Sequence, residues 1–399
     1  MIKRVAIADL RVGMFIHDLD CGWLDHPFVS NQLYVKDERA IRKLISTGLD
    51  HVYIDTERGH DVETAVEASV VDAALQLELE TVAEANQATV SPVTSENERL
   101  RAKTLLYDAT LQMRRIMEAV RSGRPLELHS LEPLIERMIQ SAFSNPHAIT
   151  SIARLKLRDE YTFMHSVSVA ALLVTFAREL DLPYSEIQGL VLGGLLHDIG
   201  KALVPLTVLN KPAALTDLEF AQMKQHVDLG SGLLCQLPGL DPVAIKVMQL
   251  HHERVDGSGY PLGLKQDQID RIGRMAAIVD VYDALTSVRV YKEAWLPNKA
   301  TKKLLEWSDS HFDRALVLHF ARCIGVYPVG SVVALESGML AIVVDQGNDL
   351  LRPLVRVVYN RKQRHFDRMR DIALEDSPTE RIVGAVDPAV YGIDIERFL

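Results

Sequence analysis

Residues 185–201 read SEIQGLVLGGLLHDIGK, and this stretch decides the fold class of the largest block of the chain. Its apolar residues recur at helical spacing, so it predicts a helix whose last turn carries His197 and Asp198 and which Gly200 terminates. An aspartate is rarely buried unless it is paired or bound to a metal. The segment therefore predicts a helix that carries an adjacent histidine and aspartate against an apolar core.

The same periodicity continues on both sides of this stretch, through residues 150–327. Apolar positions recur at helical spacing in HSVSVAALLVTFAREL, TDLEFAQMKQHVDLGSGLL, DPVAIKVMQLHH, DRIGRMAAIVDVYDALTS and KATKKLLEW. The sequence therefore predicts a mainly α protein whose centre is a compact all-helical bundle.

Four further segments flank the predicted bundle. Residues 1–60 combine strand-like runs with a helix near ERAIRKLISTG, which predicts a small α+β module. Residues 61–100 are acidic and lack aromatic side chains, which predicts an acidic helix and a flexible linker. Residues 101–149 have the pattern of a helical connector. Residues 328–399 contain runs such as MLAIVVDQ and predict a β-rich tail of three to five strands.

The composition is that of a globular protein, with 48% apolar and 25% charged residues in a chain of 399. A net charge of −10 argues against binding of a nucleic-acid polymer, which usually requires a basic surface. Cys21, Cys235 and Cys323 are far apart and form no C-x-x-C pair, as expected in a reducing compartment. We find no signal peptide and no long apolar run, so we expect a cytoplasmic protein without a membrane span.

Histidine and aspartate recur on the predicted bundle helices. Together they supply five imidazoles and two carboxylates: His165, His197, Asp198, His226, His251, His252 and Asp280. Nitrogen and oxygen ligands without a thiolate suit iron, manganese or another first-row divalent ion better than structural zinc. Any one of these histidines alone fits a hydrogen-bonded core residue, but the joint pattern favours a metal centre. Asp283 fits helix packing or support of a ligand as well as it fits metal binding.

Residues 251–261 read HHERVDGSGYP, a histidine pair followed by a glycine-rich turn. Adjacent residues of a helix point about 100° apart, so both histidines cannot face one core. A shared metal site and a surface turn are the two explanations, and the other histidines favour the first. We interpret Glu253 and Asp256 as groups that order the loop or support a ligand, and not as an acid–base pair.

The order of these residues, with HDIGK and HHERVDGSGYP intact, resembles the HD-GYP subgroup of the HD superfamily. The resemblance covers roughly residues 150–325. It implies a metal-dependent phosphodiesterase that hydrolyses cyclic di-GMP to linear pGpG, and in some members on to GMP, by attack of a metal-activated hydroxide. Residues 1–60 resemble, more weakly, a small domain of unknown function that is often joined to HD-GYP modules.

The resemblance also implies residue roles. All seven histidines and aspartates above would be metal ligands, with Asp198 bridging two ions of Fe or Mn. Lys201 would act on a phosphate or on the nucleophile, and Arg289 and Lys292 would hold the phosphates of the substrate. Tyr260 is assigned to substrate binding, with contact to a partner and support of the loop as the alternatives. Some members bind a third metal through a carboxylate four residues before the first histidine; Tyr161 stands there, so we expect two ions.

Two other functions remain open at this point. Another cyclic dinucleotide, such as 3′,3′-cyclic GMP-AMP, could be the substrate of the same chemistry. A binding module that responds to cyclic di-GMP and docks GGDEF-domain proteins through the GYP loop is the alternative from a different class. The sequence does not determine the oligomeric state, with a homodimer as one alternative.

Overall fold

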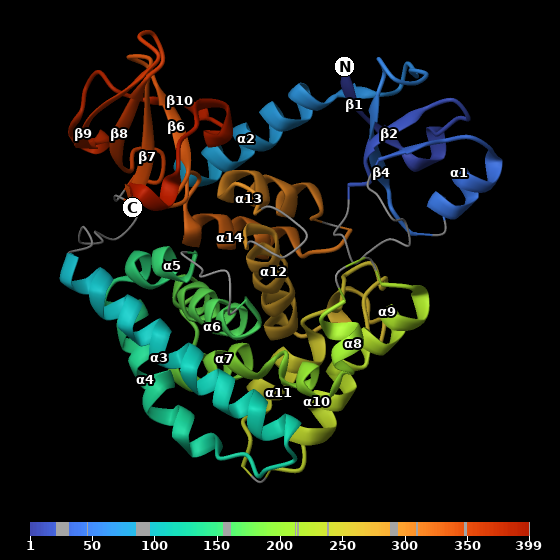
Figure 1. Cartoon of the computed structure of the whole chain (residues 1–399), viewed down its shortest axis with the longest axis vertical. Helices are drawn as coiled ribbons and strands as arrows, with labels where there is room; N and C mark the ends of the chain where they lie inside the picture. Colours follow the sequence, from blue (N-terminus) through green and yellow to red (C-terminus); the bar gives the residue numbers. More distant parts are fainter. Residues whose placement is uncertain are drawn as a thin grey trace. The chain divides into compact units, whose positions relative to one another are not determined.

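The computed structural model describes residues 1–398 apart from 21–31, 46, 85–95, 155–160, 212, 214, 238, 288–293, 309 and 347–348. The chain divides into two compact units. One contains residues 1–78 and 206–223, and the other contains residues 79–205 and 224–399. The secondary structure is mainly α-helical with two small antiparallel sheets (Figure 1), which confirms the predicted fold class.

A five-stranded antiparallel sheet organises the first unit, in the order β3-β2-β4-β1-β5. Its strands are β1 (Ile2–Ala6), β2 (Phe15–Asp18), β3 (Leu33–Tyr34), β4 (His51–Asp55) and β5 (Val66–Glu67). Helix α1 (Glu38–Ile45) contributes Ile41 and Leu44 to a core that also contains Val52 and Ile54. Gly48 lies after the end of α1, and its φ of 73° suits glycine. The short helices α8 (Leu206–Leu209) and α9 (Asp217–Lys224) also begin in this unit.

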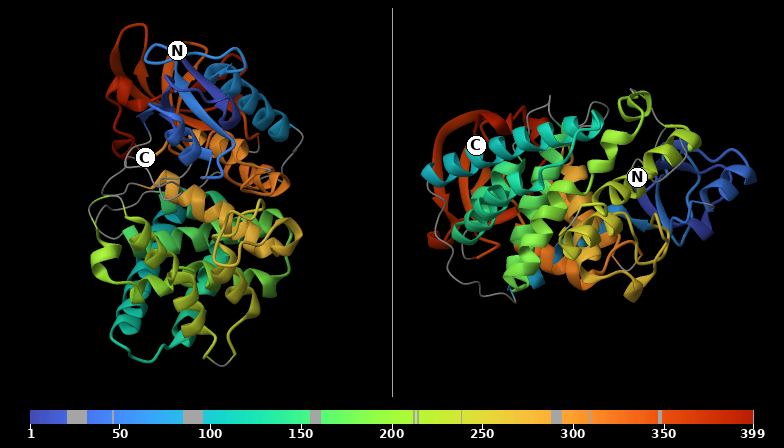
Figure 2. Two further views of the ribbon diagram at one scale, coloured as in Figure 1. Left: turned by 90° about the vertical axis from the view of Figure 1, so that its right-hand side faces the viewer. Right: turned by 90° about the horizontal axis from the view of Figure 1, so that it is seen from below.

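The second unit is a helical bundle that is entered from helix α2 (Ala68–Glu84). Its helices are α3 (Glu96–Arg121), α4 (Glu132–Ser144), α5 (Pro146–Arg154), α6 (Tyr161–Glu179), α7 (Tyr184–Leu196), α10 (His226–Leu234), α11 (Pro242–Leu250), α12 (Arg271–Thr286), α13 (Pro297–Glu306) and α14 (Arg314–Ile324). Helix α7 contacts α6 and α11, and α6 also contacts α12. Helix α3 runs along the outside of this group, against α5 and α6 (Figures 1 and 2).

Helix α7 ends at Leu196, four residues before the predicted stop at Gly200. Gly200 instead lies in a 3-10 helix, Ile199–Leu203, that contacts α10. A Cβ atom at Gly200 would come within 1.9 Å of the carbonyl oxygen of His226. Glycine is therefore required for close approach to α10 and not for termination of α7, and this approach brings Asp198 next to His226.

The C-terminal residues of the second unit form a five-stranded antiparallel sheet, in the order β10-β6-β7-β8-β9. Its strands are β6 (Val332–Leu335), β7 (Met339–Asp345), β8 (Leu354–Asn360), β9 (His365–Ala373) and β10 (Ile382–Ala385). The central strand β7 is buried along its whole length, as its apolar sequence requires. The predicted β-rich tail is therefore confirmed.

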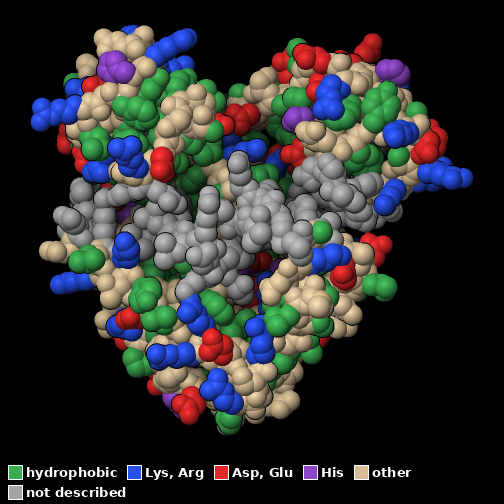
Figure 3. All heavy atoms as spheres, in the orientation of Figure 1, with side chains coloured by type: hydrophobic (Ala, Val, Ile, Leu, Met, Phe, Trp, Pro, Cys, Tyr) green, Lys and Arg blue, Asp and Glu red, His purple; other side chains and the backbone are tan. Residues whose placement is uncertain are grey.

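Charges are mixed on the face of the helical bundle that Figure 3 shows. Lys and Arg side chains lie between Asp and Glu side chains there, without one continuous basic patch among the described residues of that face. Among the helices of the described residues, none is long and apolar enough to cross a membrane.

Candidate metal centre

Five helices of the bundle, with the turns that follow two of them, bring the predicted ligands together. His165 lies in the second turn of α6, Asp280 lies in the middle of α12, and the His197-Asp198 pair follows α7 directly. His226 begins α10, and the histidine pair 251–252 follows α11. Their ligand atoms form two groups, within each of which all atoms lie within 4.8 Å of one another: Asp198, His226, His251 and His252 in one, and His165, His197 and Asp280 in the other.

The two aspartates connect these groups. Asp198 Oδ1 lies 3.3 Å from His226 Nε2, while Asp198 Oδ2 lies 3.3 Å from His197 Nε2. Asp280 Oδ1 lies 2.9 Å from His165 Nε2, while Asp280 Oδ2 lies 3.7 Å from His252 Nδ1. Each carboxylate thus has one oxygen toward each group, which is the arrangement that a bridging ligand needs.

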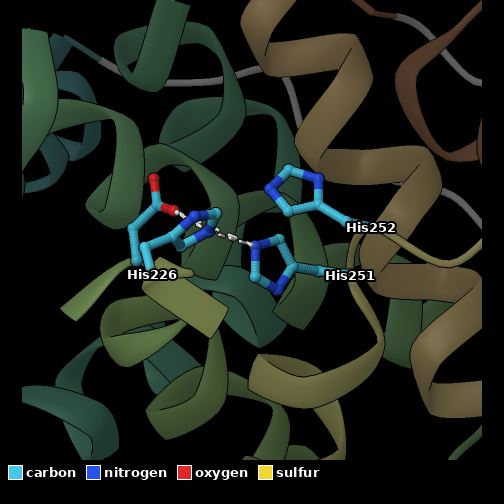
Figure 4. Close-up of side chains that lie close together, drawn as sticks. His226, His251 and His252 are labelled. Atoms are coloured by element: carbon cyan, nitrogen blue, oxygen red, sulfur yellow. Dashed lines mark hydrogen bonds and ion pairs between the residues drawn. The ribbon is translucent and has the colours of Figure 1, made fainter. Parts of the chain in front are cut away.

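Figure 4 shows one side of this arrangement. The rings of His226 and His251 approach each other from different helices, and their Nε2 atoms are 3.5 Å apart. His252 lies beside them, with its ring centroid 4.0 Å from that of His251 and 5.1 Å from that of His226. Three imidazoles therefore present nitrogens to one small region.

Hydrogen bonds on the outer side of three rings fix the direction of their inner nitrogens. His197 Nδ1 donates to the carbonyl of Gly194 at 2.8 Å, and His251 Nδ1 donates to the carbonyl of Met248 at 2.7 Å. His165 Nδ1 donates to Asp283 Oδ2 at 2.6 Å. In each ring the Nε2 lone pair is left for the centre, which is how metal-binding histidines are usually oriented.

The cluster has more polar atoms than it has internal partners. Five of the seven side chains are at most 3% exposed, yet His197 Nε2 and Asp198 Oδ1 have no hydrogen-bond partner among the described residues. Buried polar atoms are almost always hydrogen-bonded, so such orphans require a ligand. This set of nitrogen and oxygen donors fits a divalent metal ion.

The charges of the site favour ionised aspartates and a neutral His251. Burial opposes ionisation of Asp198, but Lys201 and His197 outweigh it and hold the pKa of Asp198 well below its usual range. Burial also opposes ionisation of Asp280, yet His165, whose Nε2 lies 2.9 Å from Asp280 Oδ1, holds the pKa of Asp280 well below its usual range. Burial, with His197 as the second cause, lowers the pKa of His251 to about 3. Burial opposes the charged form of His197, but the carboxylate of Asp198 outweighs it and raises the pKa of that histidine. The aspartates are therefore ionised and His251 is neutral at neutral pH, as metal ligands must be.

Two side chains of the site are partly exposed to solvent. The side chain of His252 is 20% exposed and that of Lys201 is 23% exposed, while the other six ligands are buried. Lys201 Nζ lies 2.5 Å from Asp198 Oδ2. A partly exposed ammonium is thus in contact with a buried carboxylate of the cluster.

The structure places the remaining predicted residues as follows. Tyr260 stacks on His252, with ring centroids 4.5 Å apart and planes at 29°. Arg289 and Lys292 lie outside the described residues, as does the side chain of Tyr161. Asp283, which the sequence left ambiguous, is 3% exposed and supports His165.

Comparison with known proteins agrees with this geometry. One family model, described as an HD domain, matches residues 136–316, and another, described as a domain of unknown function named DUF3391, matches residues 2–131. A Pseudomonas aeruginosa protein named as a cyclic di-GMP phosphodiesterase is 38% identical over 387 residues, which cover 96% of this chain and 92% of that protein. The chain belongs to the HD-GYP family.

Other members of the family resemble shorter parts of the chain. A Vibrio cholerae protein named cyclic di-GMP phosphodiesterase is 43% identical over 131 residues, 31% of this chain and 27% of that protein. A protein of the same organism named 3′3′-cGAMP-specific phosphodiesterase 2 is 36% identical over 164 residues, 41% of this chain and 31% of that protein. The match that spans nearly the whole chain thus carries the cyclic di-GMP name.

Proposed function

We propose that this protein is a cyclic di-GMP phosphodiesterase whose histidine–aspartate cluster binds two divalent metal ions, Fe or Mn. The observation that carries the proposal is the pair of ligand groups joined by two carboxylates, each with one oxygen toward each group. Bound metals activate a water molecule and stabilise the entering and leaving oxygens in phosphoester hydrolysis. All seven side chains would hold the ions, and Asp198 and Asp280 would each offer one oxygen to each ligand group.

Lys201 is the proposed catalytic cation. Its side chain is partly exposed to solvent, so its ammonium can meet a phosphodiester, and it lies 2.5 Å from the proposed bridging carboxylate. An ammonium placed there can donate hydrogen bonds to a phosphate oxygen as charge develops on it. Water adds to phosphorus and the bond to the 3′ oxygen breaks, so the first product is linear pGpG, which a second cycle would cut to GMP.

The substrate contacts proposed from the family resemblance extend this site. Tyr260 stacks on His252, the most exposed of the ligands, and is proposed to contact the substrate. Arg289 and Lys292 are proposed to bind the second phosphate of the substrate. We propose a cytoplasmic location for the protein, because its substrate is a cytoplasmic messenger in the family. Docking of GGDEF-domain proteins to the GYP loop and formation of a homodimer remain hypotheses.

The test is a turnover assay of the purified full chain loaded with Mn²⁺ or Fe²⁺. We expect conversion of cyclic di-GMP to pGpG, and none above background with Asp198→Ala. Competition with 3′,3′-cyclic GMP-AMP separates the two substrates, since the preferred one will inhibit hydrolysis of the other. Binding of cyclic di-GMP by a metal-loaded protein that never turns it over would overturn the proposal in favour of a binding module.

A further inference from the structure

The loop HHERVDGSGYP contains two carboxylates in opposite environments. Glu253 is 2% exposed, and its two oxygens accept hydrogen bonds from the backbone N–H groups of Leu262 and Leu264 at 2.7 and 2.9 Å. Asp256 is exposed and accepts a bond from the N–H of Ser258 at 2.8 Å. A buried carboxylate that satisfies two distant backbone donors ties the far end of the loop to its beginning, whereas Asp256 orders only its own turn.

With its two ends joined through Glu253, the loop packs against the histidine pair. The N–H of Tyr260 donates to the carbonyl of His252 at 3.0 Å, and a Cβ atom at Gly259 would lie 2.4 Å from the backbone nitrogen of Arg254. The ring of Tyr260 then lies stacked on the ring of His252. Lys224 Nζ lies 5.0 Å from the centroid of the Tyr260 ring, so a cation also packs on this aromatic group.

The loop is fixed on its other side as well. The N–H groups of Val255 and Asp256 donate to the carbonyls of His311 and Ser310, both at 3.1 Å. Gln266 N–H donates to the carbonyl of Val255 at 3.0 Å, which closes the loop as a hairpin. The position of Tyr260 is therefore imposed by bonds from both sides of the loop.

His252 differs from three of the other imidazoles in how its ring is held. Outer hydrogen bonds orient His165, His197 and His251, but among the described residues no hydrogen bond reaches the ring of His252. It is also the most exposed of the five imidazoles. The ring of His252 contacts the rings of His226 and His251, and the ring of Tyr260, from the loop, stacks on it.

We infer that Glu253 and Tyr260 are positioning residues of the metal centre. Glu253 fixes the loop, the loop fixes the Tyr260 ring, and that ring keeps His252 Nδ1 directed toward Asp280, 3.7 Å from its Oδ2. Stacking thus replaces, for His252, the outer hydrogen bond that orients His165, His197 and His251. The inference rests on the part of the proposed function that places metal at the cluster and is independent of the substrate.

The experiment is a titration of metal-free full-length protein with Mn²⁺, with free Mn²⁺ measured by electron paramagnetic resonance. We expect Tyr260→Ala and Glu253→Ala each to weaken the affinity of one of the two sites by about tenfold or more, the usual effect of removing a group that orients a ligand. Tyr260→Phe keeps the ring and should bind as the wild type does. The Co²⁺ absorption spectrum should change in the two alanine variants, because it reports ligand geometry.

A double-mutant cycle tests the route through Tyr260. If Glu253 acts through the loop and the ring, the double variant Glu253→Ala/Tyr260→Ala should bind Mn²⁺ no more weakly than the weaker single variant. Asp256→Asn is the matched control, a carboxylate of the same loop that does not tie it, and its affinity should be unchanged. Should Glu253→Ala fail to fold, Glu253→Gln, which keeps one acceptor, takes its place with an intermediate loss expected.

Three results would overturn the inference while leaving the proposed function intact: wild-type affinity in Tyr260→Ala, additive losses in the double variant, or equal losses in Asp256→Asn and Glu253→Ala. A wild-type protein that binds no Mn²⁺ would instead overturn the proposed metal centre itself. The two failures are therefore distinguishable in one titration series.

Discussion

Two buried charged regions of the helical unit are built on opposite principles. On α13, Lys303 and Glu306 form an ion pair at 2.7 Å with side chains that are 9% and 5% exposed. Each charge faces an opposite charge, and neither side chain has an orphaned atom among the described residues. In the cluster, five imidazoles surround two carboxylates, and His197 and Asp198 retain atoms without hydrogen-bond partners among the described residues. The polar atoms of the pair on α13 are satisfied by protein groups, whereas those of the cluster need a ligand.

The largest effect that sharpens this contrast is expected at Asp198. Asp198→Ala removes the carboxylate that faces both ligand groups, and we expect hydrolysis to fall by at least about 10⁴-fold, or about 5.4 kcal/mol of barrier. Metal content, measured by elemental analysis, should fall in parallel. A variant that kept its metal and its activity would make the cluster a structural feature like the pair on α13.

The second prediction breaks the matched pair. Glu306→Ala removes the carboxylate that pairs with the buried ammonium of Lys303, so the free energy of unfolding should fall by about 3–5 kcal/mol in urea titration. Metal content and turnover per folded molecule should stay at the wild-type level. Replacing both residues with apolar ones, as in Lys303→Met/Glu306→Leu, should restore most of the stability. A loss of metal in either variant would contradict the view that the ion pair on α13 is independent of the cluster.

The sequence predicted the bundle and the convergence of seven polar residues, because helical periodicity and the HD and HH pairs are local signals. It did not place Asp283, whose role depends on α12 crossing α6 and which has the same spacing as an ordinary packing residue. Nor did it place the end of α7, since Gly200 serves a contact with α10 that lies 26 residues further along the chain. The hydrogen bonds that orient His197 and His251 go to the backbone carbonyls of Gly194 and Met248. Any residue type has such a carbonyl, so the sequence could not predict these bonds.

A third, smaller effect is expected at Asp283, which shares features with both the ion pair on α13 and the histidine–aspartate cluster. Its carboxylate is buried and paired like Glu306, but its partner is a proposed ligand, His165. Asp283→Ala should weaken Mn²⁺ binding by about 10–100-fold, because it releases the ring and the proton position of His165. The same titration should show a smaller loss for Asp283→Asn, whose amide oxygen can still accept from Nδ1. Unchanged metal affinity with lower stability would place Asp283 with the α13 pair.

The smallest effect is expected at an ion pair that is partly open to solvent, in the other unit. Glu219 accepts hydrogen bonds from Lys211 and from the N–H and hydroxyl of Thr216, whose own hydroxyl accepts from the N–H of Glu219 at the start of α9. The Lys211 bond and the Thr216 bonds lower the pKa of Glu219 from 4.5 to about 2.

Because that pKa is depressed in the folded state, the contribution of Glu219 to stability is fully present above pH 4.5 and is lost as the pH falls toward about 2. Unfolding of the wild type and of Glu219→Gln should therefore differ most above pH 4.5 and converge in acid. Salt should narrow the difference at neutral pH, because exposed charges are screened, whereas the buried pair on α13 should respond little to salt. A difference that grew in acid would reverse the sign of the expected linkage and would show that Glu219 is not held ionised by its partners.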